Sequence, residues 1–262
     1  MSEGKVSTEK RGHVLLIGLD RAEKRNAFDL QMYQSLALAY GQLDRDPELR
    51  CGVLFANGEH FTAGLDLVQW APHFGTGKMP PLADGALDPL GFDDENRLTK
   101  PIVMAVQGYC LTLGIELLLA TDIRVASEDT SFAQIEIKRG IYPVGGATVR
   151  LIQEVGWGNA MRYLLTADSF SAQEAYRMGL VQEVVPTGKQ METAVSIAET
   201  IAKQAPLGVY ATLKSARLAR AQGEQIALAR LLPDLLPLMA SEDVQEGVQS
   251  FVERREAQFK GR

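Results

Sequence analysis

The chain has 262 residues, and its 46% of apolar side chains suffice for one or two domains with a well-buried core. Its 27 basic and 33 acidic side chains give a net charge of −6, which argues against a general attraction to nucleic acids or anionic membranes. Two cysteines without CxxC spacing indicate neither a disulfide framework nor a zinc site. No run of about 18 apolar residues and no signal peptide is present, so we expect a soluble, cytoplasmic protein without a metal, a membrane or a nucleic-acid partner.

Strand and helix patterns alternate along the first two thirds of the chain. Short apolar runs are followed by amphipathic stretches, as at 13–20 and 28–46, where Asp29 is the expected N-cap. The predicted strands are 13–20, 51–57, 101–108, 121–127 and 179–186, and 131–140 is predicted as a strand or a short extended segment leading to a turn. The predicted helices are 28–46, the end of 58–70, 114–120, 145–156 and 159–167. This alternation predicts the α/β fold class.

Two regions depart from this pattern. Residues 71–100 are rich in Pro, Gly and Asp, and loops of this length are usually functional lids or disordered segments. Beyond Thr187 only helix patterns occur, at 189–205, 206–223 and 241–259. Their apolar and charged faces indicate packing on the core, on a partner subunit, or on both. We therefore expect a core over 1–187 and a helical C-terminal region over 188–262.

Several common catalytic arrangements are absent from the sequence. It contains no GxSxG, no HExxH, no P-loop and no GxGxxG after a strand. His13, His60 and His73 lie far apart and beside no obvious nucleophile, so surface or loop positions are expected for them. What remains unusual is the presence of carboxylates in apolar settings, where an unpaired charge costs several kcal/mol.

Two glutamates have such settings. Glu116 lies among Leu and Ile side chains in "LTLGIELLLATDI", and Glu136 lies twenty residues later in "FAQIEIKRG". Glu116 could be the charged edge of a helix paired with Arg124, and Glu136 could lie on the polar face of an alternating strand. A catalytic pair is the other interpretation, and spacing alone leaves both open because structural ion pairs produce the same settings.

Six segments, in order and at their spacings, resemble one family. They are "RAEKRNAF", "FTAGLDL", "KPIVMAVQGYCLTLGIELLLATDIRVAS", "FAQIEIKRGIYPVGGATVRL", "SAQEAYRMGLVQEVVP" and "QAPLGVYATLK". Over nearly its whole length the chain resembles the crotonase superfamily, the enoyl-CoA hydratase and isomerase group. The resemblance implies a spiral core of repeated strand, strand, helix turns. It also implies a C-terminal helical region that forms trimers or dimers of trimers and completes the active site.

The resemblance also implies an activity, the syn addition of water across the 2,3 double bond of an enoyl-CoA thioester. Coenzyme A is then part of the substrate, and no further cofactor is implied. Backbone N–H groups of Ala63 and Leu113 would form an oxyanion hole, which stabilises charge that develops in the transition state. Glu116 would orient and activate water for attack at C3, and Glu136 would supply the proton to C2. Because two carboxylates sharing one water are not both readily ionised, one should have a raised pKa.

The resemblance further implies contacts to coenzyme A. The nucleotide would lie along a basic cluster formed by Arg21, Lys24 and Arg25, although a solvated run of charges explains the cluster equally well. The pantetheine and thioester would contact 63–66, where Gly64 allows close approach of the backbone. The full expected set of CoA and substrate contacts is Lys24, Arg25, Ala27, Ala63, Gly64, Leu65, Asp66, Leu113, Phe259 and Lys260, the last two reaching a neighbouring subunit's site.

Two departures from the family pattern affect the expected activity. Leu113 stands where many hydratases have glycine; it is not expected to adopt a positive φ, and its bulk bears on the size of the acyl group. Val144 stands where dienoyl-CoA isomerases have a third acid, which argues against that activity. Two alternatives remain: a Δ3,Δ2-enoyl-CoA isomerase, which needs only the acid near Glu136, and a catalytically silent binding homologue.

Overall fold

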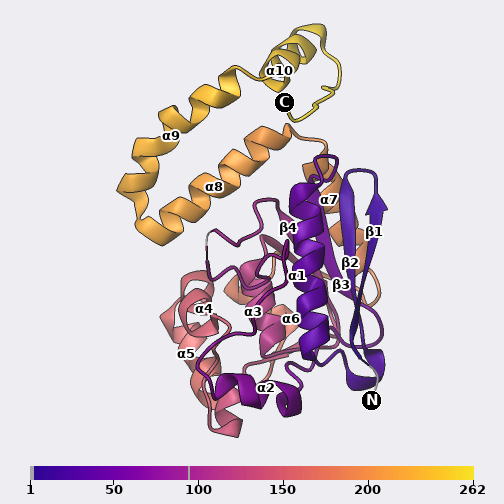
Figure 1. Cartoon of the computed structure of the whole chain (residues 1–262), viewed down its shortest axis with the longest axis vertical. Coiled ribbons are helices and arrows are strands. Elements are labelled where there is room, and N and C mark those ends of the chain that lie inside the picture. Colours follow the sequence, from indigo (N-terminus) through magenta and orange to yellow (C-terminus); the bar gives the residue numbers. More distant parts are fainter. Residues whose placement is uncertain (1–2, 94) are drawn as a thin grey trace.

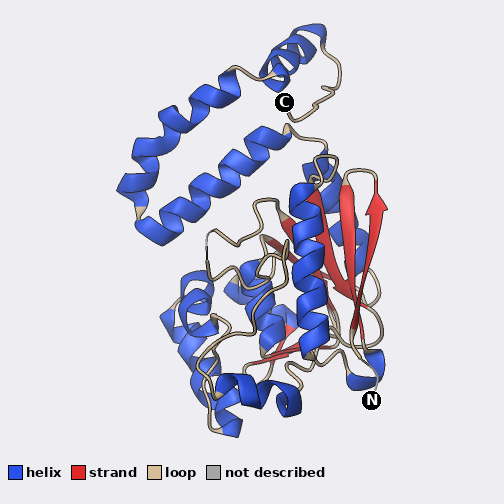
Figure 2. Ribbon diagram, in the orientation of Figure 1, coloured by secondary structure: helices blue, strands red, loops and turns tan. Residues whose placement is uncertain are grey.

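The computed structural model describes residues 3–93 and 95–262 and has two sheets surrounded by helices (Figures 1 and 2). The larger sheet has the order β1-β2-β3-β4-β6-β9, in which β1 is antiparallel to β2 and the other neighbours are parallel. Its strands are β1 (Lys5–Arg11), β2 (Val14–Asp20), β3 (Cys51–Ala56), β4 (Ile102–Val106), β6 (Ile123–Ser127) and β9 (Glu183–Val185). The expected α/β class is confirmed.

Both faces of the larger sheet are buried, as is usual for parallel strands. Leu15 and Ile17 of β2 contribute to the core on the side of helix α1 (Leu30–Arg45), whereas Val14 and Leu16 contribute to a second core. Helix α7 (Gln190–Ala202) covers that second core, and Figure 1 shows it behind the strands. The predicted division after Thr187 stays a prediction, although α7 packs on the sheet and the arm that leaves it begins at Pro206.

The smaller sheet reveals the spiral of the chain. It consists of β5 (Tyr109–Leu111), β7 (Ser131–Ala133) and β8 (Phe170–Ser171). Isolated parallel bridges continue its ladder between Phe28 and Leu65 and between Thr62 and Cys110. Each turn of the chain thus places one strand in the larger sheet and one extended segment in the smaller layer, before a helix leads to the next turn.

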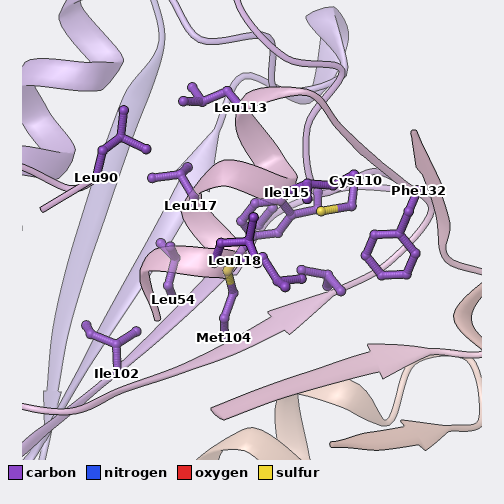
Figure 3. Packing of buried hydrophobic residues seen from close by; sticks show 14 of the residues in the cluster. Leu54, Leu90, Ile102, Met104, Cys110, Leu113, Ile115, Leu117, Leu118 and Phe132 are labelled. Carbon is purple, nitrogen blue, oxygen red and sulfur yellow. The ribbon is translucent and has the colours of Figure 1, made fainter. Parts of the chain in front are cut away.

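The remaining helices of the core surround the site described below. They are α2 (Leu67–Phe74), α3 (Leu113–Ala120), α4 (Ala147–Val155), α5 (Trp157–Thr166) and α6 (Ala172–Met178), with 3₁₀ turns η1 (Ala22–Lys24) and η2 (Glu136–Arg139). Helix α3 is buried almost all round, and Figure 3 shows Leu117 and Leu118 packed with Leu54 and Met104 of the sheet.

The C-terminal region begins with two long antiparallel helices, α8 (Pro206–Gln222) and α9 (Glu224–Met239), and ends with α10 (Glu242–Glu253). Figure 1 shows α8 and α9 extending away from the sheets. Helix α9 was not among the three predicted C-terminal helices, because Pro233 and Pro237 lie inside it and proline usually ends a helix. Strand β1 was also missed, because its side chains are mostly exposed and polar and give no apolar alternation.

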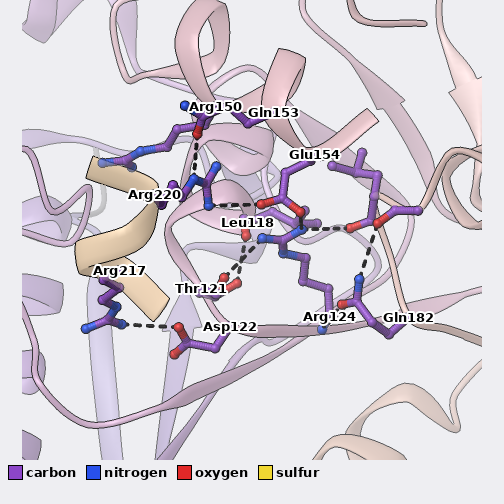
Figure 4. Close-up of polar contacts among 12 residues, drawn as sticks. Leu118, Thr121, Asp122, Arg124, Arg150, Gln153, Glu154, Gln182, Arg217 and Arg220 are labelled. Carbon is purple, nitrogen blue, oxygen red and sulfur yellow. Dashed lines mark hydrogen bonds and ion pairs between the residues drawn. The ribbon is translucent and has the colours of Figure 1, made fainter. Parts of the chain in front are cut away.

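Ion pairs connect α8 to the core (Figure 4). Arg217 contacts Asp122 at 3.1 Å, and Arg220 contacts Glu154 at 3.0 Å. The buried Arg124 also pairs with Glu154, at 3.1 Å, so the suggested pairing of Arg124 with Glu116 is wrong.

The described residues of the long connection after α2, 75–93 and 95–101, form no helix or strand, yet the connection is attached to the core at several points. Asp88 accepts hydrogen bonds from the Tyr33 hydroxyl and from the N–H groups of Leu90 and Phe92. Arg150 donates to the carbonyl oxygens of Leu90 and Gly91. Residue 94 of the suggested lid lies outside the described residues.

Gly41 of α1 and the backbone of this connection are in direct contact, which gives a stability prediction. A Cβ at Gly41 would lie 1.9 Å from the Gly85 carbonyl oxygen. We expect Gly41→Ala to lower the free energy of unfolding by about 1–3 kcal/mol through overpacking. Gly158→Ala in α5 is the control, because a Cβ there meets nothing within 4 Å and Ala favours a helix by about 0.5–1 kcal/mol. Urea denaturation measures both, and equal stabilities of the two variants would contradict the contact.

Candidate active site

A cavity of about 170 Å³ lies where three turns of the spiral meet. Its walls come from the segment before α2, from the start of α3, and from η2 with the residues that follow it. The lining residues are Ala63, Leu65, Leu67, Phe74, Thr112, Leu113, Glu116, Ile135, Glu136, Arg139, Ile141, Tyr142 and Val144. Five residues of the expected site therefore come together: Ala63, Leu65, Leu113, Glu116 and Glu136. None of the described residues from 75 to 100 lines this cavity.

Glu116 is held at the cavity by the start of a different helix. It lies in the first turn of α3 with only 4% of its surface exposed. Its Oε1 accepts hydrogen bonds from the N–H of Gly145 at 2.5 Å and of Ala147 at 3.4 Å, where α4 begins. A Cβ at Gly145 would lie 2.1 Å from Glu116 Oε2, so glycine is required there. In the sequence, the pair Gly145 and Gly146 before a helix pattern could have indicated this contact, but the sequence analysis did not draw that inference.

Glu136 begins the 3₁₀ turn η2 and not a continuing strand. Strand β7 ends at Ala133, so the interpretation of Glu136 as the polar face of an alternating strand is wrong. The carboxylate is half-buried, and its Oε2 atom has no hydrogen-bond partner among the described residues. A buried acceptor without a partner favours the protonated carboxyl group or a bound water.

Both glutamates have raised pKa values. Burial, and then the charge of Glu136, raise the pKa of Glu116 to about 7, against the lowering effect of the Ala147 and Gly145 N–H groups and of Arg150. Burial raises the pKa of Glu136 to about 7 as well. The sequence predicted a raised pKa for one of the two glutamates, and both have one. Near neutral pH the pair is therefore suited to hold one proton.

The backbone N–H groups of two residues that line the cavity, Leu65 and Leu113, have no hydrogen-bond acceptor among the described residues. The N–H of Phe28 donates to the Gly64 carbonyl, and the N–H of Asp66 donates to the Phe28 carbonyl. Because backbone groups alternate in direction along an extended segment, the N–H of Leu65 points away from Phe28. Within the described parts of the chain, neither the Leu65 N–H nor the Leu113 N–H at the start of α3 has an acceptor.

The N–H of Ala63 is not available, which corrects one expected role. It donates to the Arg25 carbonyl at 2.9 Å. Ala63 therefore lines the cavity without a free donor, and Leu65, two residues later, has the free N–H instead. The alternation of backbone direction along 63–65 was not considered in the sequence-based choice.

Thr112 carries the unusual backbone conformation before α3. Its φ is +51° and its ψ is −113°, so Leu113 itself keeps a helical conformation, as expected. Thr112 Oγ1 lies 2.0 Å from where a Cβ of Gly64 would be, and Gly64 has φ +102°. Glycine at 64 thus permits the close approach of two chain segments, although Gly64 does not line the cavity.

The basic cluster near the N-terminus divides into two parts. Arg21 is buried and pairs with Asp66 at 3.0 Å and with Asp29 at 3.5 Å, so Arg21 and Asp66 have a structural role. Lys24 and Arg25 are exposed, and the Arg25 guanidinium lies 5.8 Å from the Tyr109 ring centre. Ala27 is half-buried and, like these side chains, lies outside the cavity lining.

Phe259 and Lys260 are bound to their own chain and not to this cavity. The Phe259 carbonyl accepts a hydrogen bond from Arg50 at 2.7 Å, and the Lys260 N–H donates to Asp243 at 2.7 Å. Their expected contact with a neighbouring subunit's CoA stays a prediction.

The structure adds wall residues that the sequence analysis did not select. Leu67, Phe74, Ile141 and Tyr142 give the cavity apolar sides, and Arg139 adds its one basic group among the lining residues. Among the residues that the structure describes, no group of three or more His, Cys, Asp or Glu side chains is placed to hold a metal ion. Likewise, none of the described helices is long and apolar enough to cross a membrane.

The raised pKa of Glu136 gives a prediction for stability against pH. The folded state holds this proton more tightly than the unfolded chain, whose carboxyl has a pKa near 4.5, so the stabilisation is complete below pH 4.5 and is lost as the pH rises to about 7. We expect Glu136→Gln to become more stable relative to the unchanged protein over that range, as measured by urea denaturation at several pH values. Parallel stability curves would contradict the raised pKa.

Comparisons with known proteins identify the family of the chain. The family described as enoyl-CoA hydratase/isomerase matches residues 9–262. The enoyl-CoA hydratase EchA19 of Mycobacterium tuberculosis is 36% identical over 259 residues, which are 97% of this chain and 96% of the relative. The 2,3-dehydroadipyl-CoA hydratase of Escherichia coli is 34% identical over 264 residues and all of both chains.

Solved structures are similar over nearly the whole length. A protein described as a probable enoyl-CoA hydratase/isomerase from Mycobacterium abscessus has a TM-score of 0.95 and 50% identity, with 98% of each chain covered. An enoyl-CoA hydratase from Mycobacterium tuberculosis has a TM-score of 0.89 and 34% identity, covering 98% of this chain and 99% of its own. The chain therefore has the crotonase fold and belongs to the enoyl-CoA hydratase/isomerase family.

Proposed function

We propose that this protein is an enoyl-CoA hydratase that adds water in syn fashion across the 2,3 double bond of an enoyl-CoA thioester. The observation that carries the proposal is the presence of one buried and one half-buried carboxyl group, each with a pKa of about 7, in one cavity with two backbone N–H groups that have no acceptor among the described residues. Coenzyme A belongs to the substrate, and the proposed chemistry requires no metal or redox cofactor.

In this mechanism the thioester oxygen accepts hydrogen bonds from the N–H groups of Leu65 and Leu113. These fixed donors stabilise the enolate oxygen more than the ground-state carbonyl. Glu116, ionised, orients a water and takes one of its protons while the water oxygen bonds to C3. Glu136, protonated, gives its proton to C2, so the pair ends with its single proton on Glu116.

The relatives differ in the acyl group of the substrate for which they are named, so they do not identify the acyl group for this chain. They include hydratases named for mevalonyl-CoA and 2,3-dehydroadipyl-CoA and dehydratases named for carnitinyl-CoA, at 34–35% identity. Leu113, Leu67 and Phe74 narrow the cavity of about 170 Å³, which favours a short acyl group. Lys24 and Arg25 are proposed to meet the CoA phosphates, and the cytoplasm is the proposed location.

Replacement of either glutamate tests the hydratase proposal. We expect Glu116→Gln and Glu136→Gln each to lower kcat about 10²- to 10⁴-fold with little change in KM, because both act on the reacting water or proton. Loss of the enone absorbance of crotonyl-CoA measures the rate. Glu183→Gln, at an exposed position of β9, is the control and should keep full activity. Equal rates in all four proteins, or no turnover of any enoyl-CoA by the unchanged one, would refute the proposal.

The isomerase alternative predicts a different pattern. Proton transfer between C2 and C4 needs only Glu136, so an isomerase would act on 3-enoyl-CoA and tolerate Glu116→Gln. The silent homologue would bind CoA esters without turnover of either substrate. The burial of Glu116 and its two backbone hydrogen bonds support hydration, since an unused buried carboxylate would be costly to keep.

We further propose that the C-terminal arm assembles the chain into trimers or dimers of trimers. Helix α9 exposes a row of large apolar side chains, more than a monomer normally leaves in water. They are Ile226, Leu228, Leu231, Leu232, Leu235, Leu236 and Met239. Other copies of the chain would cover this row and remove it from water.

Charges in this row should break the assembly. We expect light scattering to give three or six times the mass of one chain for the unchanged protein and a smaller species for the double variant Leu232→Glu, Leu236→Glu. Gln173→Glu adds one charge at an exposed position of α6, outside α9, and should leave the mass unchanged. A monomer for the unchanged protein would contradict the proposal.

A further inference from the structure

Arg139 is a basic side chain in the wall of an otherwise apolar and acidic cavity. It lines the cavity together with Glu136 and with the apolar side chains of Leu67, Phe74 and Ile141. Its one hydrogen bond among the described residues is a long one, 3.4 Å, to the carbonyl of the preceding Lys138. Its exposed guanidinium forms no ion pair with Glu116, Glu136 or another described carboxylate, so most of its five N–H donors remain for a ligand.

The local backbone explains why Arg139 faces the cavity. Glu136 and Arg139 are the first and last residues of η2, and side chains three apart eclipse one another in a 3₁₀ turn. At a rise of about 2.0 Å per residue, the two Cα atoms are separated by about 6 Å along the axis. Gly140 follows with φ +76° and turns the chain back, so that Ile141 and Tyr142 return to the same cavity.

This arrangement fixes an order of groups along a bound acyl chain. With the thioester oxygen at the N–H groups of Leu65 and Leu113, C2 and C3 lie at the two glutamates, and the far end of a short chain extends past Glu136. A guanidinium group at that end would bind a carboxylate through two parallel hydrogen bonds. A purely apolar chain would offer the exposed guanidinium no such bonds and leave it to water.

We propose that Arg139 is a specificity-determining residue and that the preferred substrate carries a carboxylate at the far end of a short acyl chain. The substrate class is thus the monothioester of coenzyme A with a short unsaturated dicarboxylic acid. This inference rests on the proposed hydratase function and adds the class of acyl group to it.

The test compares two substrates of equal length, trans-2-hexenoyl-CoA and its analogue with a terminal carboxylate in place of the methyl group. We expect a higher kcat/KM for the carboxylate. Arg139→Gln should lower kcat/KM for that substrate about 10- to 100-fold, the range for a lost hydrogen bond to a charged group, and should change the value for hexenoyl-CoA little. Arg139→Lys should recover part of the loss. Lys138→Gln is the matched control, because Lys138 belongs to the same η2 turn and does not line the cavity.

The outcomes separate this inference from the function on which it rests. Hydration of hexenoyl-CoA with no preference for the carboxylate, or equal effects of Arg139→Gln on both substrates, would overturn the role of Arg139 and leave the hydratase proposal intact. Equal effects of Lys138→Gln and Arg139→Gln would mean that the preference for the carboxylate comes from the general surface charge. That result would also overturn the role of Arg139. Failure to hydrate either substrate would overturn both.

Discussion

The rest of the site depends on the hydrogen bonds that the first residues of α4 donate to the Glu116 carboxylate. A carboxylate with 4% of its surface exposed is costly unless hydrogen bonds compensate it, and the N–H groups of Gly145 and Ala147 provide them. Those N–H groups favour the charged form, while burial and Glu136 oppose it, and the result is a pKa of about 7. Stronger hydrogen bonds would lower the pKa of Glu116 and keep it ionised at neutral pH. Weaker ones would raise the pKa and leave the carboxyl group neutral.

The spiral topology makes this contact possible. Three consecutive turns contribute Leu65, Leu113 with Glu116, and Glu136 to one cavity, although the sequence separates the first and last by about 70 residues. Parallel bridges of the smaller layer, such as that between Thr62 and Cys110, hold these turns in register. The Arg124–Glu154–Arg220 cluster shown in Figure 4 then attaches the C-terminal arm to the same core. The same core therefore positions both the site residues and the C-terminal arm.

The sequence predicted the parts of the structure that depend on local patterns. The N-cap of α1 is an example: Asp29 accepts from the Met32 N–H at 2.7 Å, as expected from its place before an amphipathic run. The two glutamates were found because charge in an apolar setting is visible in the sequence, and resemblance to a family assigned them roles. That resemblance also implied the spiral core and the role of Leu113, whereas the α/β class followed from the alternation of strand and helix patterns.

Contacts between distant segments could not be predicted in this way. The oxyanion donor was placed at Ala63 because nothing in "FTAGLD" shows that its N–H is already bound to Arg25, 38 positions earlier. Arg139 was passed over because its orientation depends on η2, where a strand had been expected. Helix α9 was missed because packing against α8 outweighs the local cost of two prolines.

Glu116 and Glu136 together are expected to hold one proton near neutral pH. Carboxyl ¹³C NMR of protein labelled at the glutamate side chains measures this directly, with Glu116→Gln and Glu136→Gln used to assign the two signals. We expect two coupled titrations with pKa values well above the ordinary value of 4.5, and one protonated carboxyl group in the pair at pH 7. Titration of both carboxyls near 4.5, which would leave two anions at neutral pH, would contradict it.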